Sequence, residues 1–164
     1  MISVEEARRR IVAAFAPLGS EQVSLTEALG RVLAEDVAAR VDQPPVAVSA
    51  MDGYAVRAVD VVTLPATLKV VGYSRAGAGH PGTVGPGEAV RIFTGAPVPA
   101  GADTIVIQEN TSADGERVTV REGTAPPGRF IRPAGLDFKA GQVGLRGGRR
   151  LTARDVGLAA AMNR

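Results

Sequence analysis

Three short segments of the sequence carry side chains that could do chemistry together: residues 49–53 (SAMDG), 94–95 (TG) and 132–137 (RPAGLD). Each combines a carboxylate or a hydroxyl with a nearby glycine, at the edge of a strand that the sequence predicts. Loops at the edges of a sheet can converge in space. If these three converge, their two carboxylates and one threonine would form a site suited to Mg²⁺-assisted chemistry on phosphate, or to binding an oxyanion.

Each segment also has a simpler interpretation when it is taken alone. The pair Asp52-Gly53 is typical of a turn, because glycine permits positive φ and aspartate accepts bonds from nearby backbone amides. The hydroxyl of Thr94 could satisfy its own backbone in a turn. Arg132 and Asp137 could form a solvated ion pair. Both interpretations stay open, since one sequence does not show whether loops converge.

Residues 77–82 (GAGHPG) match the G-x-G-x-x-G spacing of dinucleotide-binding loops. We reject this interpretation, because such a loop must open a helix whose amides face the pyrophosphate, and Pro81, Gly85 and Pro86 disfavour a helix here. His80 is the only histidine, which excludes a zinc site built from a histidine cluster. We expect His80 to be exposed.

Composition argues against several classes of protein. The chain has 164 residues, no cysteine, and 19 Lys+Arg against 17 Asp+Glu, for a net charge of +2. Without cysteine there are no disulfides or thiolate metal sites, and so small a charge surplus predicts no nucleic-acid partner. The first ten residues lack the basic start of a signal peptide, and no segment is apolar enough to span a bilayer. We therefore expect a cytoplasmic protein that binds neither nucleic acid nor membranes.

Helices are predicted at both ends of the chain. Ser3 and Glu6 have the spacing of a capping box, and apolar residues then recur at helical intervals until Pro17. A shorter helix over residues 27–29 would be capped by Thr26.

The last helix is predicted by Thr152 and Asp155, which again have capping-box spacing. The sequence stops soon afterwards, without a glycine cap or a further strand to cover this helix. This end indicates a fragment of a longer protein; a fraying terminal helix is the alternative.

The middle of the chain is predicted to be all β. From about residue 50 to residue 120, short β-branched runs alternate with glycine and proline. Residues 104–120 read as one hairpin with Asp114-Gly115 near its tip. The many bends favour a small barrel or sandwich.

These patterns predict an α+β chain with an amino-terminal helix. A β-barrel-like second domain, residues 46–129, is inserted in a small mixed α/β first domain formed by residues 1–45 and 130–164. Adjacent prolines at 44 and 45 mark the first boundary.

Three long strings resemble the amino-terminal part of the molybdopterin molybdenumtransferase (MoeA) family, whose eukaryotic relatives include the gephyrin E domain. They are SAMDGYAVR (49–57), RIFTGAPVPAGADTIVIQE (91–109) and RFIRPAGLDFKAG (129–141), preceded by ALGRVLAEDV (28–37). The strings occur in the family's order and at its spacing. The resemblance covers essentially the whole chain.

The resemblance implies molybdenum cofactor biosynthesis by an enzyme that inserts molybdate into adenylylated molybdopterin while the adenylate is hydrolysed. Mg²⁺ would be its cation, held by Asp52 or Asp137. The resemblance assigns catalytic positions and weaker cofactor-binding positions: Asp52, Thr94 and Asp137 for the first group, and Ser49, Gly53, Gly95 and Arg132 for the second.

The family architecture implies an elongated homodimer with shared active sites, small-molecule substrates, and molybdopterin adenylyltransferase as a further partner. The family's cofactor-binding α/β domain and carboxy-terminal β domain would follow the last helix and are absent from this sequence. We therefore expect the fragment to be inactive alone. The alternative is a non-catalytic, β-rich binding or dimerisation module, which a natural stop codon after Arg164 would favour.

Overall fold

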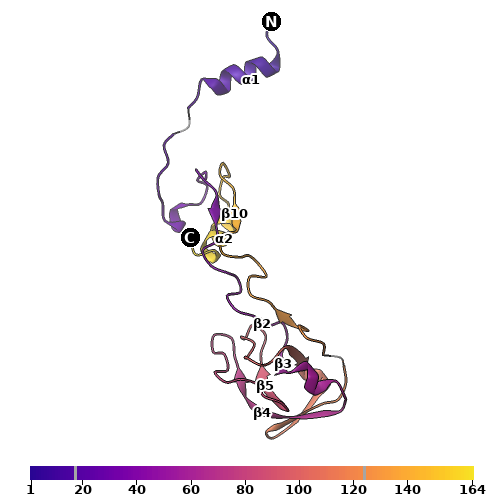
Figure 1. Ribbon diagram of the computed structural model, residues 1–164. Helices are drawn as coiled ribbons and strands as arrows, with labels where there is room; N and C mark the ends of the chain where they lie inside the picture. Colours follow the sequence, from indigo (N-terminus) through magenta and orange to yellow (C-terminus); the bar gives the residue numbers. More distant parts are fainter. Residues whose placement is uncertain (17, 124) are drawn as a thin grey trace.

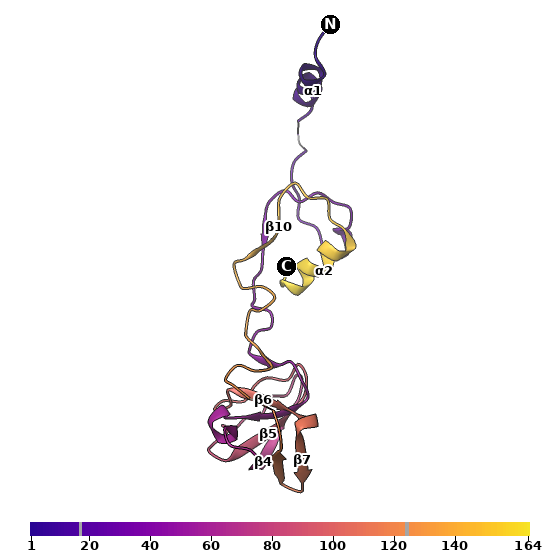
Figure 2. The same cartoon turned by 90° about the vertical axis from the view of Figure 1, so that its right-hand side faces the viewer.

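The chain is elongated, with three parts in a row. A computed structural model describes residues 1–16, 18–123 and 125–164. Helix α1 (Val4–Ala13) stands apart at one end, in both views of the molecule (Figures 1 and 2). A middle lobe (residues 25–42 and 138–164) follows, and a β lobe (residues 46–132) forms the other end.

The remaining elements are short and mostly strands. In chain order they are the 3₁₀ helix η1 (Leu25–Glu27), β1 (Val37–Ala38), β2 (Val48–Ser49), β3 (Gly53–Val56), the 3₁₀ helix η2 (Ala58–Val61), β4 (Ala66–Ser74), β5 (Glu88–Ile92), β6 (Thr104–Ile107), the 3₁₀ helix η3 (Gln108–Asn110), β7 (Thr111–Asp114), β8 (Arg117–Val120), β9 (Ile131–Arg132), β10 (Val143–Leu145) and α2 (Ala153–Ala161). The α+β class is confirmed.

A six-stranded sheet in the order β6-β3-β5-β4-β8-β7 builds the β lobe. Only β4 and β5 are parallel; the other neighbours are antiparallel. Strands β6 and β7 lie at opposite edges although only η3 separates them in the chain, so the sheet curls into a half-barrel. The insertion of residues 46–129 as a separate domain stays a prediction.

The prediction of one hairpin over residues 104–120 is wrong for the first part of this range, which forms β6. The hairpin is β7–β8, in which Asp114 pairs with Arg117 around Gly115, whereas β6 pairs with β3. The chain turns at η3 between them, where the Thr111 hydroxyl donates to the Gln108 carbonyl at 2.7 Å. That local bond ends the ladder that an uninterrupted hairpin would need.

Both faces of β3 are covered, because all four of its residues are buried. Tyr54 and Val56 pack in one apolar cluster with residues of β4, β6 and β8, and Ala55 packs in a second with residues of β5 and β6. Alternate side chains of a strand point to opposite faces. A fully buried valine contributes roughly 1.5–3 kcal/mol to the free energy of unfolding, so the two clusters hold this inner strand firmly.

The middle lobe joins residues from both ends of the chain. Strand β1 pairs with β10, and they are covered by the buried side chains of Ala159 in α2 and of Met162, which directly follows α2. The capping box predicted for α2 is confirmed in both directions: the Thr152 hydroxyl accepts from the Asp155 N–H, and the Asp155 carboxylate accepts from the Thr152 N–H.

The amino-terminal helix forms as predicted, and the Ser3 hydroxyl accepts from the Glu6 N–H at 3.2 Å. The helix ends at Ala13, and the predicted stop at Pro17 lies outside the described residues. None of its residues is buried, and Ile11 and other apolar side chains are exposed.

The short helix predicted over residues 27–29 is instead a single 3₁₀ turn, η1. Ser24 precedes this turn, so Thr26 lies inside the turn and does not cap it. The Ser24 hydroxyl bonds to the Thr26 hydroxyl and to the Glu27 carboxylate. Within the described residues, no helix is long and apolar enough to cross a membrane.

Candidate functional site

Asp52 and Thr94 meet in a direct contact. Asp52 Oδ1 accepts two hydrogen bonds from Thr94, one from the backbone N–H at 2.7 Å and one from the hydroxyl at 2.8 Å. Asp52 is half-buried and Thr94 is exposed, so the pair lies at the surface of the β lobe. Two of the three segments singled out in the sequence therefore lie side by side.

The backbone around this contact is held by further hydrogen bonds. The Gly95 N–H donates to the Ser49 carbonyl at 2.8 Å, and the Ser49 N–H donates to the Ala96 carbonyl at 2.9 Å. The Ser49 hydroxyl is fully buried and donates to the Met51 carbonyl at 2.6 Å. In this arrangement, Ser49 shapes the turn that carries Asp52; its contact to a bound anion stays a prediction.

Glycine is favoured at Gly53 and at Gly95 for different physical reasons. A Cβ at Gly53 would lie 2.0 Å from the Val106 carbonyl oxygen, so only glycine lets β3 and β6 approach here. Gly95 has φ of 79°, in the left-handed region, and a Cβ there would meet nothing within 4 Å. Space beside Gly95 is therefore open, whereas Gly53 faces protein. Ligand binding by either glycine stays a prediction.

The segment 132–137 contacts the segment 49–53 at its first residues. Strand β9 pairs with β2, placing Ile131 opposite Ser49 and Arg132 opposite Val48. The Ala50 N–H donates to the Phe130 carbonyl at 2.8 Å. Arg132 is exposed beside the turn that leads to Asp52.

Asp137 lies farther along the same segment. Its N–H donates to the Gln43 carbonyl at 2.8 Å, and the Gly135 N–H donates to the Pro44 carbonyl at 2.9 Å. These contacts tie the segment to the connection between the two lobes. Asp137 is exposed, and no contact in the described part of the chain joins it to Asp52 or Thr94. Its place in a common site stays a prediction.

The surroundings of Asp52 favour its charged form. The Thr94 N–H, and then the Thr94 hydroxyl, lower the pKa of Asp52 below its ordinary value; partial burial raises it, and the charge of Arg91 makes the smallest lowering contribution. Asp52 is therefore an anion at neutral pH. Because both bonds use Oδ1, the second oxygen, Oδ2, retains the capacity to accept a bond or to bind a cation.

The donor set only partly fits Mg²⁺. Within the described residues, no three or more His, Cys, Asp or Glu side chains are grouped as metal ligands. Mg²⁺ often keeps several waters and binds one or two carboxylates together with substrate phosphates. Asp52 Oδ2 suits one such ligand position.

Sequence reasoning missed two residues next to Asp52. Arg91 donates to the Gly53 carbonyl, and Gln108 donates its N–H to the Asp52 carbonyl. The available signal was an arginine between Val90 and Ile92 of β5, because a charge among apolar residues needs a partner.

His80 is also placed differently from the expectation. It is half-buried, and its ring lies against Gly72 and Gly82: a Cβ at either glycine would come within 2.6–2.7 Å of the imidazole. The two glycines make room for the ring, so His80 belongs to the packing of its loop.

Known proteins share the sequence and the architecture of this chain. The family model described as MoeA N-terminal region (domain I and II) matches residues 2–163. The molybdopterin molybdenumtransferase of Nostoc sp. is 41% identical over 146 residues, which cover 87% of this chain and 33% of the relative. Molybdopterin molybdenumtransferase 1 of Mycobacterium tuberculosis is 37% identical over 183 residues, covering all of this chain and 43% of the relative.

Two crystal structures of molybdopterin biosynthesis MoeA proteins from Pyrococcus horikoshii are also similar. One has a TM-score of 0.80 and 37% identity, covering 87% of this chain and 38% of its own; the other has a TM-score of 0.85 and 31% identity, covering 99% and 42%. The chain thus spans less than half the length of these relatives. It belongs to the family of MoeA N-terminal regions.

Proposed function

We propose that this chain is the amino-terminal region of a cytoplasmic molybdenum cofactor biosynthesis enzyme, which inserts molybdate into adenylylated molybdopterin with hydrolysis of the adenylate. The observation that carries the proposal is the bonded pair of Asp52 and Thr94, in a chain that is 41% and 37% identical to two proteins named molybdopterin molybdenumtransferase. Because the chain spans 43% or less of those relatives, we propose that it is inactive alone.

Asp52 is the anionic group of the proposed site. Its Oδ2 can accept a proton from a hydrolytic water or provide one oxygen ligand to Mg²⁺. Bound Mg²⁺ would supply positive charge that offsets charge on a phosphate. Asp137 would be the second carboxylate of the same site, and Arg132, which is exposed beside the Asp52 turn, would contact an anionic substrate group.

The Thr94 hydroxyl is not free to donate a hydrogen bond to a substrate. A hydroxyl has one proton, and that of Thr94 is donated to Asp52. To donate to a phosphate or molybdate oxygen, Thr94 would have to turn away and leave Asp52 with the backbone N–H alone. The role that fits this geometry is to orient Asp52, with the open space beside Gly95 available to substrate.

The proposed partners follow from the same assignment. The small-molecule substrates are molybdate and adenylylated molybdopterin, molybdopterin adenylyltransferase would be a further partner, and the intact protein would be a homodimer. The exposed apolar side chains of α1, which include Val4, Ile11 and Val12, support a protein contact at that helix.

A chimaera tests the proposal. The matching region of M. tuberculosis molybdopterin molybdenumtransferase 1 is replaced by this chain and expressed in cells that lack their own transferase. Molybdenum cofactor is then measured through a molybdenum-dependent enzyme. We expect the chimaera to restore cofactor, and Asp52→Asn to lower the rate of insertion by about 100-fold, the loss typical of removing an acid–base group.

Asp114→Asn is the matched control, because Asp114 is an exposed carboxylate at the β7–β8 turn. It should leave the rate of insertion unchanged. Full activity of Asp52→Asn, or a folded chimaera that forms no cofactor, would contradict the proposal.

A further inference from the structure

We propose that Arg91 is a positioning residue for Asp52: its guanidinium fixes the carbonyl of Gly53, the residue after Asp52, and so helps to aim the Asp52 carboxylate at Thr94. This inference rests on the proposed function of the site. Arg91 lies in β5, directly opposite Tyr54 of β3. From there it reaches the backbone next to Asp52.

Four contacts hold the guanidinium in one place. Nη1 donates to the Gly53 carbonyl at 2.8 Å, and Nη2 donates to Gln108 Oε1 at 2.6 Å. The guanidinium carbon lies 5.2 Å from the centre of the Tyr54 ring and 4.9 Å from that of Phe93. The two hydrogen bonds fix the orientation of the guanidinium plane, and the two aromatic rings limit its movement out of that plane, so the guanidinium has little freedom to move.

Gln108 completes the same arrangement. Its side chain accepts from Arg91, and its backbone N–H donates to the Asp52 carbonyl at 3.1 Å. The carbonyls of Asp52 and Gly53 are therefore both held, one by Gln108 and the other by Arg91. With these two consecutive carbonyls fixed, the Asp52 side chain starts from a fixed position.

The role of Arg91 is geometric more than electrostatic. Of the causes that lower the pKa of Asp52, the charge of Arg91 is the smallest, behind both hydrogen bonds from Thr94. Arg91 bonds to the backbone beside Asp52 and not to its carboxylate. Arg91→Lys separates these effects, because lysine keeps the charge but cannot donate to both partners from a rigid planar fork.

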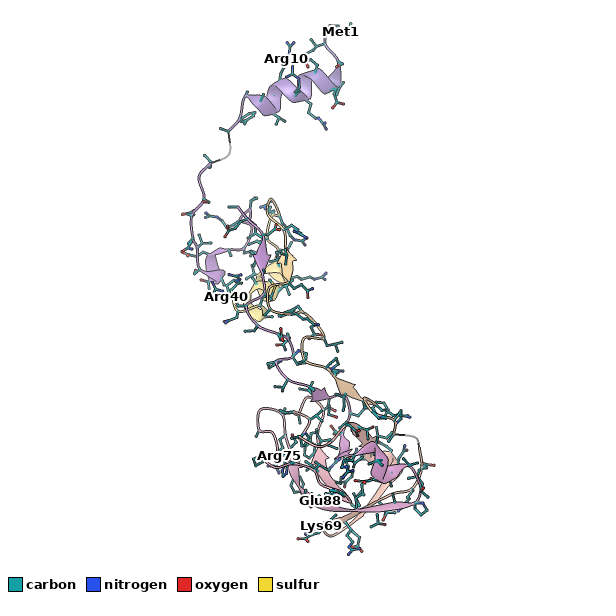
Figure 3. The ribbon with its side chains drawn as sticks, viewed as in Figure 1. Met1, Arg10, Arg40, Lys69, Arg75 and Glu88 are labelled. Carbon is teal, nitrogen blue, oxygen red and sulfur yellow. The ribbon has the colours of Figure 1, made fainter. Side chains whose placement is uncertain are left out.

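The first test is NMR spectroscopy of the chain itself. In Arg91→Lys, we expect the Thr94 amide proton to lose part of its hydrogen-bonded shift and to exchange with solvent about tenfold faster, as for the loss of about one hydrogen bond. Arg75→Lys is the matched control: Arg75 lies at the outside of the β lobe (Figure 3), with its guanidinium 5.7 Å from the Tyr73 ring centre. It should leave Thr94 unchanged.

A second variant decides the case if Arg91→Lys does not fold. Gln108→Ala removes the side-chain anchor of Arg91 and keeps the N–H that bonds to Asp52. We expect a smaller change at the Thr94 amide, in the same direction. If each folded variant leaves that amide as it is in Arg75→Lys, the inference is overturned.

The chimaera supplies a functional readout. We expect Arg91→Lys to lower its maximal rate about 10- to 100-fold, as for groups that orient a reacting side chain, with KM nearly unchanged. Full activity would overturn the inference. If the unsubstituted chimaera forms no cofactor, the proposed function fails, while the NMR result still decides whether Arg91 positions Asp52.

Discussion

Gly53→Ala should destabilise the β lobe more than other glycine substitutions, because an added Cβ would lie closer to neighbouring atoms at Gly53 than at any other glycine. The new Cβ would lie 2.0 Å from the Val106 carbonyl oxygen and 3.0 Å from the Cα of Ile107, whereas ordinary contact begins at 3.4 Å. Both neighbours belong to the backbone of β6, so no side chain can rotate away. The two strands would have to separate by more than 1 Å.

The magnitude follows from what such a separation breaks. The adjacent bond from the Gln108 N–H to the Asp52 carbonyl is already 3.1 Å long and would be lost. Overpacking a core costs about 1–3 kcal/mol, and each lost hydrogen bond about 1 kcal/mol. We expect the free energy of unfolding to fall by about 3 kcal/mol. With an m-value of roughly 2 kcal/mol/M, the urea midpoint falls by about 1.5 M.

Tyrosine fluorescence is the suitable assay, because both tyrosines, Tyr54 and Tyr73, lie in β3 and β4. Gly157→Ala is the control: this glycine lies inside α2 with open space at its Cβ, so alanine should stabilise that helix by about 1 kcal/mol. An unchanged urea midpoint in Gly53→Ala, with both tyrosines unfolding as in the unsubstituted chain, would refute the packing argument.

Two further predictions concern buried polar contacts. Hydrogen bonds from the Thr152 N–H, the Thr152 hydroxyl and Arg149 lower the pKa of Asp155 from 3.8 to about 2. The stability that the Asp155 carboxylate supplies is therefore complete above about pH 4 and is lost as the pH falls towards 2. Thermal unfolding of Asp155→Asn should show a smaller decline of the melting temperature over that range than the unsubstituted chain does. Ser74→Ala should lower the free energy of unfolding by about 1–2 kcal/mol, because the buried Ser74 hydroxyl donates to the Pro97 carbonyl at 2.6 Å; urea unfolding measures this, with the more exposed Ser112→Ala as control.

Local signals in the sequence predicted much of the fold. The Thr152 capping box forms in full, the Ser3 hydroxyl accepts from the Glu6 N–H, and strands β3 to β8 lie in the region of about residues 50–120 that the β-branched runs predict. These features depend on residues close in the chain, where propensity and capping act directly. The error over residues 104–120 came from the same source, since a turn at η3 sent β6 to the far edge of the sheet.

Contacts between distant residues could not be predicted in this way. The meeting of Asp52 with Thr94 spans 42 residues and depends on strand register, and the role of Arg91 depends on which strand lies beside β5. The family resemblance predicted catalytic roles for Asp52 and Thr94, but it did not predict a hydrogen bond between them. It also gave no sign that Thr94 donates its only hydroxyl proton to Asp52.

Strand register explains why the site forms at this end of the sheet. Gly53, the first residue of β3, lies opposite Ile92, the last of β5, and opposite Ile107, the last of β6. Because β3 is antiparallel to both β5 and β6, the residue before β3 and the residues after β5 and β6 leave the sheet at the same end of the strands. Asp52, Thr94 and Gln108 are therefore brought together by the two ladders themselves. A slip of one residue in either ladder would turn the buried side chains of β3 to the wrong face, so the packing that stabilises the sheet also fixes the geometry of the site.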